Sequence, residues 1–310
     1  MKLQVNSLRK SYGTHEVVRD VSFTIETGEI VGLLGPNGAG KTSIVSMLYG
    51  AVVPDSGESY FESETVRANS ADPSSRKLIG IVTQENSLDP DFPVFQNLTL
   101  FASYHGIPAK LAEEKAKQLL EAVGLTEFAR HKVHTLSGGM QRRLVLARSL
   151  IADPKIIFLD EPTTGFDPDA RQDLWALIGT LRKEGRSILL TTHYMDEAER
   201  LCDRILLLQA GKIIDQGSPE NLIQRIVGDE ILEFTRISKI DLLELLSEQR
   251  ELRAILEKAE SVPFGEGFCL ELNEDTERLF DHFGASDIKV SRRVTNLEDV
   301  FFRLTGDRLR

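Results

Sequence analysis

The segment GPNGAGKTS, residues 35–43, constrains the fold more than any other stretch of this chain. It follows the apolar run EIVGLL and precedes KTSIVSMLYG, which has helical spacing. It fits the pattern G-x-x-x-x-G-K-[ST], in which backbone N–H groups and a helix N-terminus converge on one point. An ordinary glycine-rich turn is the alternative, but it does not explain the flanking strand and helix. The segment, called the phosphate loop below, predicts an α/β fold that binds phosphate groups.

Each part of the phosphate loop has an expected role. The glycines let the backbone wrap around phosphate oxygens, and the helix start adds partial positive charge. Lys41 is expected to reach the β- and γ-phosphates, and the Thr42 hydroxyl to ligate Mg²⁺. The residues expected to bind the nucleotide phosphates are Gly35, Pro36, Asn37, Gly38, Ala39, Gly40, Lys41, Thr42 and Ser43.

Three further apolar runs end in polar residues: LIGIVTQ, KIIFLDEP and RSILLTTH. Such runs are typical of parallel strands buried on both faces, and ligands bind beyond the carboxyl ends of these strands. Gln84, Asp160, Glu161 and His193 lie at these ends. Asp160 is a candidate Mg²⁺ ligand, Glu161 can activate a water, and His193 can hydrogen-bond a γ-phosphate. A solvated acidic turn and a structural histidine are the alternatives.

A second glycine motif, LSGGMQRRL at residues 136–144, is called the signature segment below. Ser137 can cap the helix that follows, while Gly138 and Gly139 expose its backbone amides. A simple helix cap, without any ligand, explains the motif equally well at this stage. Met140, Leu144, Ala147 and Ile151 fall on one face of that helix and are expected to be core residues.

Patterning along the chain predicts the domain organisation. The runs KLQVNSL and VVRDVSFTI predict an N-terminal antiparallel β subdomain, and helical spacing predicts a helical subdomain at about 90–152. Past about residue 225 a smaller α+β unit begins, in which residues 241–260 have the pattern of one amphipathic helix. The expected domains are therefore 1–225, with a mostly parallel sheet, and 226–310.

Composition excludes several classes of protein. The formal net charge of −11 argues against nucleic acid as a partner. Two cysteines are too few for a disulfide framework and indicate a reducing compartment. The opening residues lack the apolar region of a secretory signal, and no apolar stretch approaches the roughly 18–20 residues of a membrane helix. We expect a cytoplasmic protein that reaches a membrane only by docking to another protein.

The motifs, taken in order, resemble the ATP-binding subunit of an ABC transporter over residues 1 to about 225. The order is the phosphate loop, Gln84, the signature segment, IIFLDEP, TTGFDP and His193. This resemblance implies a P-loop NTPase core that hydrolyses ATP with Mg²⁺ as a head-to-tail homodimer. Each ATP would lie between the phosphate loop of one subunit and the signature segment of the other.

The resemblance also implies roles for individual residues. Ser137, Gly138 and Gly139 would bind the partner's ATP, and Asp167 would lie in the loop that links the two sites. Gln84 would reach Mg²⁺ and the attacking water and mark the groove for a membrane partner. Tyr12 would stack on the adenine. The sequence departs from the usual pattern at Met140, where glutamine is common, and at Phe166, where leucine is common.

Two segments narrow the resemblance to one branch of the family. QENSLDPDFPVFQNL after residue 83 and the tail VTNLEDVFFRLTGDRLR resemble ATPases of type 2 ABC exporters, which include nodulation-factor, polyketide-drug and polysaccharide exporters. The branch implies an ATPase that powers export through a separate integral-membrane permease, on the inner face of the cell membrane. A soluble ABC-type regulator of a cytosolic assembly and a non-catalytic scaffold are the alternatives.

Overall fold

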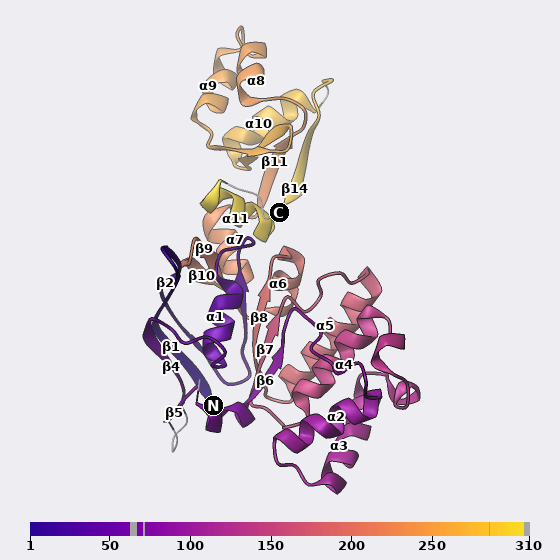
Figure 1. Ribbon diagram of the computed structural model, residues 1–310. Coiled ribbons are helices and arrows are strands. Elements are labelled where there is room, and N and C mark those ends of the chain that lie inside the picture. Colours follow the sequence, from indigo (N-terminus) through magenta and orange to yellow (C-terminus); the bar gives the residue numbers. More distant parts are fainter. Residues whose placement is uncertain (63–66, 71, 285, 307–310) are drawn as a thin grey trace. The chain divides into compact units, whose positions relative to one another are not determined.

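The chain divides into two units, Met1–Gln216 and Gly217–Arg310 (Figure 1). The computed structural model describes residues 1–62, 67–70, 72–284 and 286–306, so the last four residues of the exporter-like tail lie outside it. The sequence placed the domain boundary near residue 225. Helix α7 (Pro219–Ile226) instead begins the second unit, where it packs against α11 (Leu297–Thr305). The division into an ATPase core and an accessory domain stays a prediction.

A six-stranded sheet forms the centre of the first unit, in the order β10-β9-β3-β8-β7-β6. The pairs β9–β3, β3–β8, β8–β7 and β7–β6 are all parallel. Every residue of β3, β7 and β8 is buried, as the continuous apolar runs predicted. The strands are β3 (Ile30–Leu34), β6 (Ile79–Val82), β7 (Ile156–Asp160), β8 (Ser187–Thr192), β9 (Arg204–Gln209) and β10 (Lys212–Gly217).

An antiparallel sheet in the order β2-β1-β4-β5 accompanies the central sheet. Helix α1 (Lys41–Leu48) shares one hydrophobic cluster with both sheets: its Ile44 and Met47 join Leu3 and Phe23 of the antiparallel sheet and Phe158 of β7. This core fixes the start of α1, and with it the phosphate loop, relative to the strand ends. The antiparallel strands are β1 (Lys2–Tyr12), β2 (His15–Ile25), β4 (Ser56–Glu62) and β5 (Arg67–Asn69).

Three α-helices lie between β6 and β7 in the chain and form a cluster beside the sheet (Figure 1). They share a hydrophobic core of their own, to which Leu98, Leu120, Leu144 and Ala147 contribute. Helix α4 also packs against β6, the edge strand of the central sheet. These helices are α2 (Val94–Tyr104), α3 (Ala109–Ala122) and α4 (Gly138–Leu150), with short 3-10 turns η1 (Pro73–Leu78), η2 (Thr126–Phe128) and η3 (Val133–Thr135) nearby; α5 (Pro168–Lys183) and α6 (Met195–Leu201) follow β7 and β8.

The second unit is a four-stranded antiparallel sheet, in the order β12-β13-β11-β14, with helices. The single helix expected at 241–260 is wrong, because the chain turns between two shorter helices, where the Gln249 N–H donates to the Leu246 carbonyl at 3.0 Å. The turn lets Leu242, Leu246 and Leu256 all pack into one core. The elements are β11 (Glu230–Phe234), α8 (Lys239–Leu245), α9 (Arg250–Lys258), β12 (Ser261–Phe264), β13 (Gly267–Glu271), α10 (Glu274–Phe283) and β14 (Val290–Val294).

Candidate functional site

The phosphate loop connects β3 to α1, and two of its glycines are required by the backbone around them. A Cβ on Gly35 would lie 2.3 Å from the Leu208 carbonyl oxygen of β9, far inside contact distance. Gly40 has φ +105°, in the left-handed region, and a Cβ there would lie 2.8 Å from the Val17 carbonyl oxygen. The loop therefore lies tightly against neighbouring strands.

Lys41 is the first residue of α1 and is only 5% exposed. Its Nζ donates to the carbonyl oxygens of Gly35 at 2.8 Å and Pro36 at 3.2 Å, and lies 3.6 Å from Glu161 Oε1. Burial lowers the pKa of Lys41, and the Glu161 carboxylate opposes that shift. The buried Lys41 cation of the phosphate loop thus lies next to Glu161, the acidic residue that follows β7.

The two carboxylates after β7 have different surroundings. Asp160 is buried and accepts hydrogen bonds from the Thr191 hydroxyl and, at 3.5 Å, from the Thr42 hydroxyl. Glu161 has φ +47°, a conformation that few non-glycine residues adopt, and its N–H donates to the Thr191 carbonyl at 3.0 Å. Its Oε2 lies 3.4 Å from His193 Nδ1. The turn at Glu161 therefore aims its carboxylate toward Lys41 and His193, while Asp160 faces Thr42.

A cavity of about 530 Å³ opens over the phosphate loop, and we call it the phosphate cavity. Three of the four polar residues expected at strand ends line it, from three neighbouring strands: Gln84 after β6, Glu161 after β7 and His193 after β8. Its lining residues are Val17, Asn37, Gly38, Gly40, Lys41, Thr42, Ser43, Gln84, Glu161, Thr164 and His193. The structure thus brings the phosphate loop, Gln84, Glu161 and His193 together from four separate segments of the chain.

Two residues with implied roles lie outside the lining of the phosphate cavity. Tyr12 ends β1 and is 49% exposed, with Lys10 Nζ 5.7 Å from its ring centroid. Asp167 caps α5, where its Oδ1 accepts from the Ala170 N–H at 2.8 Å. Their roles at the adenine and at a subunit interface stay predictions.

The signature segment also lies outside the lining of the phosphate cavity. Ser137 caps α4, and its Oγ accepts from the Met140 N–H at 3.3 Å, as the capping interpretation predicted. Ser137 and Gly138 are exposed and Gly139 is half-buried. The helix start is therefore open to solvent.

Sequence reasoning missed two polar residues behind the cavity. The Thr191 hydroxyl of β8 donates to Asp160 Oδ1 from a fully buried position. Arg142 of α4 is 4% exposed and donates to the carbonyls of the turn after β7 and of the segment after β6. Thr191 was missed because it lies within the apolar run that forms β8. Arg142 was missed because arginine side chains are usually exposed. The doubled arginine in MQRRL was the available signal.

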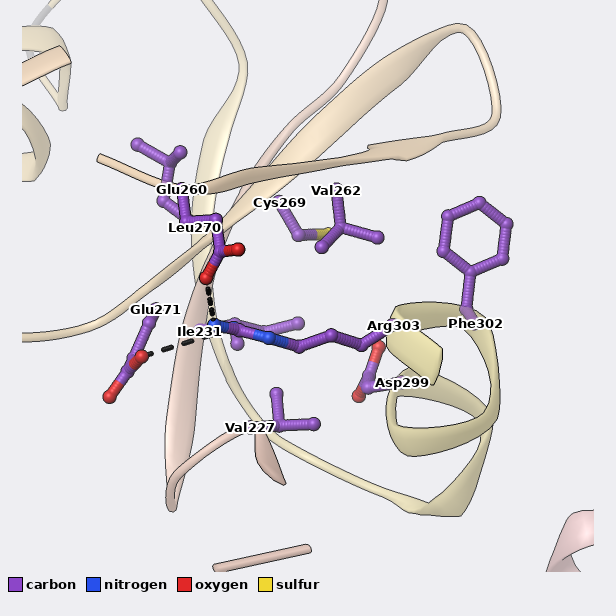
Figure 2. A pocket seen from close by; sticks show the side chains of 10 residues that line it. All are labelled: Val227, Ile231, Glu260, Val262, Cys269, Leu270, Glu271, Asp299, Phe302 and Arg303. Atoms are coloured by element: carbon purple, nitrogen blue, oxygen red, sulfur yellow. Dashed lines mark hydrogen bonds and ion pairs between the residues drawn. The ribbon is translucent and has the colours of Figure 1, made fainter. Parts of the chain in front are cut away.

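The second unit contains a cavity of its own, between β11, β12, β13 and α11 (Figure 2). Arg303 points across it and forms ion pairs with Glu260 and, at 3.9 Å, Glu271. Burial raises the pKa of the Cys269 thiol beside it to about 12. The open space is about 20 Å³, enough for a single water and far too small for a nucleotide. The phosphate cavity is the candidate site, because the polar residues predicted from the sequence gather there.

Comparison with known proteins agrees with this geometry. A family model described as ABC transporter matches residues 18–164. The "Nod factor export ATP-binding protein I" of Cupriavidus metallidurans is 39% identical over 99% of this chain and 98% of its own length. This chain belongs to the ATP-binding subunits of ABC transporters. A protein of the same name from Bradyrhizobium diazoefficiens is 42% identical, over 99% of this chain and 97% of its own.

Solved structures of ABC ATPases share the fold of the first unit. An ATP-binding cassette solved as a dimer in a post-hydrolysis state, bound to ADP and Pi, has a TM-score of 0.63 and 26% identity, covering 70% of this chain and 98% of its own. An ATP-binding subunit of an ABC transporter has a TM-score of 0.65 and 26% identity, covering 73% and 93%. The chain is thus an ABC ATPase. Within the described residues, no helix combines the length and the apolarity that crossing a bilayer requires.

Proposed function

We propose that this ABC ATPase powers export through a separate membrane permease, to which it docks as a homodimer on the cytoplasmic face of the cell membrane. The phosphate cavity carries the proposal, because it gathers Lys41, Gln84, Glu161 and His193 from four segments around one space. Full-length relatives named for Nod factor export support the direction of transport, and the dimeric solved cassettes support the homodimer.

In the proposed reaction a water attacks the γ-phosphorus of ATP and Glu161 accepts a proton from that water. The bond between the γ-phosphorus and the β–γ bridging oxygen breaks, so ADP and phosphate are released. The Glu161 carboxylate lies 3.6 Å from Lys41 Nζ and 3.4 Å from His193 Nδ1, both of which are groups suited to bind phosphate oxygens. His193 Nδ1 is buried and faces Glu161, and the residue lines the phosphate cavity, so we propose that the imidazole donates a hydrogen bond to the γ-phosphate. Gln84 lines the same cavity and is proposed to orient the water and reach Mg²⁺.

The donor set beside the phosphate loop fits Mg²⁺. One carboxylate, Asp160, faces one hydroxyl, Thr42, at 3.5 Å. Mg²⁺ is usually bound by one or two protein carboxylates together with substrate phosphates and waters. We propose that Thr42, Asp160 and Gln84 hold the ion, which supplies charge neutralisation at the β- and γ-phosphates. A buried Asp160, fixed by the Thr191 hydroxyl, is a suitably rigid ligand.

The signature segment is proposed to serve the partner subunit. A Cβ on Gly138 would meet nothing within 4 Å, and one on Gly139 would only reach Ala170 at 3.7 Å, so space remains over these amides. Ser137, Gly138 and Gly139 start a helix of thirteen residues, whose positive end suits a γ-phosphate. We assign Asp167 to the same interface and Tyr12 to the adenine of its own subunit.

A second cavity of the first unit, about 320 Å³, is proposed to receive a cytosolic segment of the permease. Tyr49 after α1, Ile81 of β6 and Phe101 of α2 give it apolar walls, and Arg76 adds one cation. Strand β6 leads directly from this cavity into Gln84, only a few residues later. A permease segment seated here would therefore contact the strand that positions a residue of the ATP site.

Glu161→Gln tests the proposed chemistry. The amide keeps the shape of the side chain but cannot accept a proton, so ATP turnover should fall about 10²–10⁴-fold while ATP binding remains. An ATP-bound dimer should then accumulate on a sizing column with Mg-ATP. Glu127→Gln, which removes the same charge from an exposed turn, is the matched control and should behave like the parent protein. Near-normal turnover in Glu161→Gln contradicts the assignment.

A further inference from the structure

Arg142 binds the main chain on both sides of the catalytic residues. It lies one turn into α4 and is 4% exposed. Its guanidinium donates to five carbonyl oxygens, namely those of Thr83, Gln84 at 3.3 Å, Asp160 at 2.9 Å, Glu161 at 3.2 Å and Pro162 at 3.0 Å. The five bonds join the segment after β6 to the turn after β7.

Such an arginine is poorly explained by packing alone. Burial lowers the pKa of Arg142 to about 10, and the charges of Asp160, Glu197 and Glu161 oppose that shift. Buried ion pairs can often be replaced as a whole by apolar residues of similar size without loss of stability. The planar fork of five N–H donors, in contrast, matches a set of acceptors that no apolar side chain can hold. The five carbonyl acceptors therefore favour an arginine at position 142, because its planar guanidinium has donors in matching directions.

The helix that carries Arg142 begins at the signature segment. Gly139 and Arg142 are three residues apart on α4, so they lie close together on adjoining turns of one rigid element. A displacement of the helix start would move the guanidinium, and with it the peptides of Gln84 and Glu161. These two peptides hold the side chains proposed to orient and activate the attacking water.

We propose that Arg142 is a positioning residue that couples the signature segment to the chain's own Gln84 and Glu161. The inference rests on the proposed function, because it takes Glu161 as the base and the signature segment as a contact for the partner's ATP. Binding of that ATP at Ser137 and Gly139 would fix α4, and Arg142 would then hold Gln84 and Glu161 in the arrangement that hydrolysis requires. Hydrolysis at one site thereby depends on occupancy of the other.

Arg142→Lys and Arg142→Met test the coupling in the full-length protein, with Arg186→Met as the matched control. Arg186 lies just before β8, is half-buried, and donates to the Pro154 carbonyl at 2.8 Å, outside the phosphate loop and the signature segment. The readouts are the melting temperature, the Kd for a fluorescent ATP analogue, and kcat and KM for Mg-ATP. In the Glu161→Gln background, ATP-driven dimer formation is also measured on a sizing column.

The coupling predicts a loss of kcat with little change in nucleotide affinity. A small misplacement of catalytic groups costs about 10²-fold, so kcat should fall by that factor in Arg142→Met, with Kd and KM within about threefold of the parent values. Arg142→Lys has three donors on a point charge and should fall between. Arg186→Met should keep the parental kcat, because Arg186 bonds the main chain away from Gln84 and Glu161.

Three results would overturn the proposal. The first is a parental kcat in a folded Arg142→Met. The second is an equal loss of kcat and nucleotide affinity, which indicates general damage to the site. The third is misfolding of Arg142→Lys as well as Arg142→Met, which would make the guanidinium a fold element only. Failure of the proposed function is recognised separately, because Glu161→Gln would then keep its turnover whatever Arg142 does.

Discussion

A mixture of two inactive variants should regain ATP sites if each site is shared between subunits. Lys41→Ala removes the buried cation of the phosphate loop, and Ser137→Arg places a bulky side chain at the exposed start of α4. Each variant as a homodimer has two defective sites. In a heterodimer one site combines both defects, and the other combines an intact phosphate loop with an intact signature segment. Random pairing of equal amounts restores roughly a quarter of all sites.

The structure gives the size of each effect. Ser137 Oγ accepts one long hydrogen bond, 3.3 Å from Met140 N, on an exposed turn. Losing that cap costs an amount near the low end of about 0.5–2 kcal/mol, too little to unfold the first unit. Losing charge-assisted contacts to a γ-phosphate costs about 1.5–3 kcal/mol each, so the loss of one or two of them weakens nucleotide trapping about 10–10⁴-fold.

The assay first measures the amount of nucleotide trapped per verified heterodimer, and then measures the rate of ATP turnover of the same sample. Thr126→Arg adds the same side chain to an exposed turn outside the signature segment, and it should leave trapping unchanged. Full activity of Ser137→Arg alone would show that the serine only caps its own helix. An absence of recovered trapping in a verified heterodimer would equally refute the shared site.

Three further predictions concern single features. A fragment ending at Gln216 should still bind a fluorescent ATP analogue, because every residue lining the phosphate cavity precedes that position; a folded fragment without binding would contradict the site map. Gly40→Ala should abolish nucleotide binding, measured by the same titration, whereas Gly185→Ala, at a similarly positive φ but with open space around it, should cost stability only. Trp175→Phe removes the donor to the buried Glu197 carboxylate, whose pKa burial already raises, and should lower the free energy of unfolding by about 1–3 kcal/mol in denaturant titrations. That loss should shrink as the pH falls toward the ordinary pKa of glutamate, since a protonated Glu197 needs the donor less.

The sequence predicted the parts of the site that depend on local pattern. The apolar runs located β3, β6, β7 and β8, and the rule that parallel strands present their carboxyl ends together placed Gln84, Glu161 and His193 around one cavity. What it could not predict depends on contacts between distant segments. Thr191 and Arg142 act on residues 31 and up to 59 positions away, and nothing in their neighbours along the chain marks those partners.

The second unit illustrates the same limit in its core. Residues 241–260 carry one continuous amphipathic pattern, yet the chain breaks into α8 and α9. The periodicity of a sequence shows that one face of a helix is apolar. It does not show whether one straight helix can place all of those apolar residues in the same core. Packing Leu242, Leu246 and Leu256 into a single core decided the outcome, and that core includes strands from much later in the chain.

All five hydrogen bonds of Arg142 are accepted by main-chain carbonyls, and this affects which mutations can compensate for the loss of Arg142. Every residue supplies the same carbonyl whatever its side chain, so substitutions at Thr83 or Pro162 leave these acceptors in place. Gln84 and Glu161 likewise accept through their main-chain carbonyls and not through their side chains. A lineage that lost Arg142 could not regain the contact by changing the residues it touches. We therefore expect genetic suppressors of an Arg142 defect to arise in α4 itself or at the proposed subunit interface, and not among its five bonding partners.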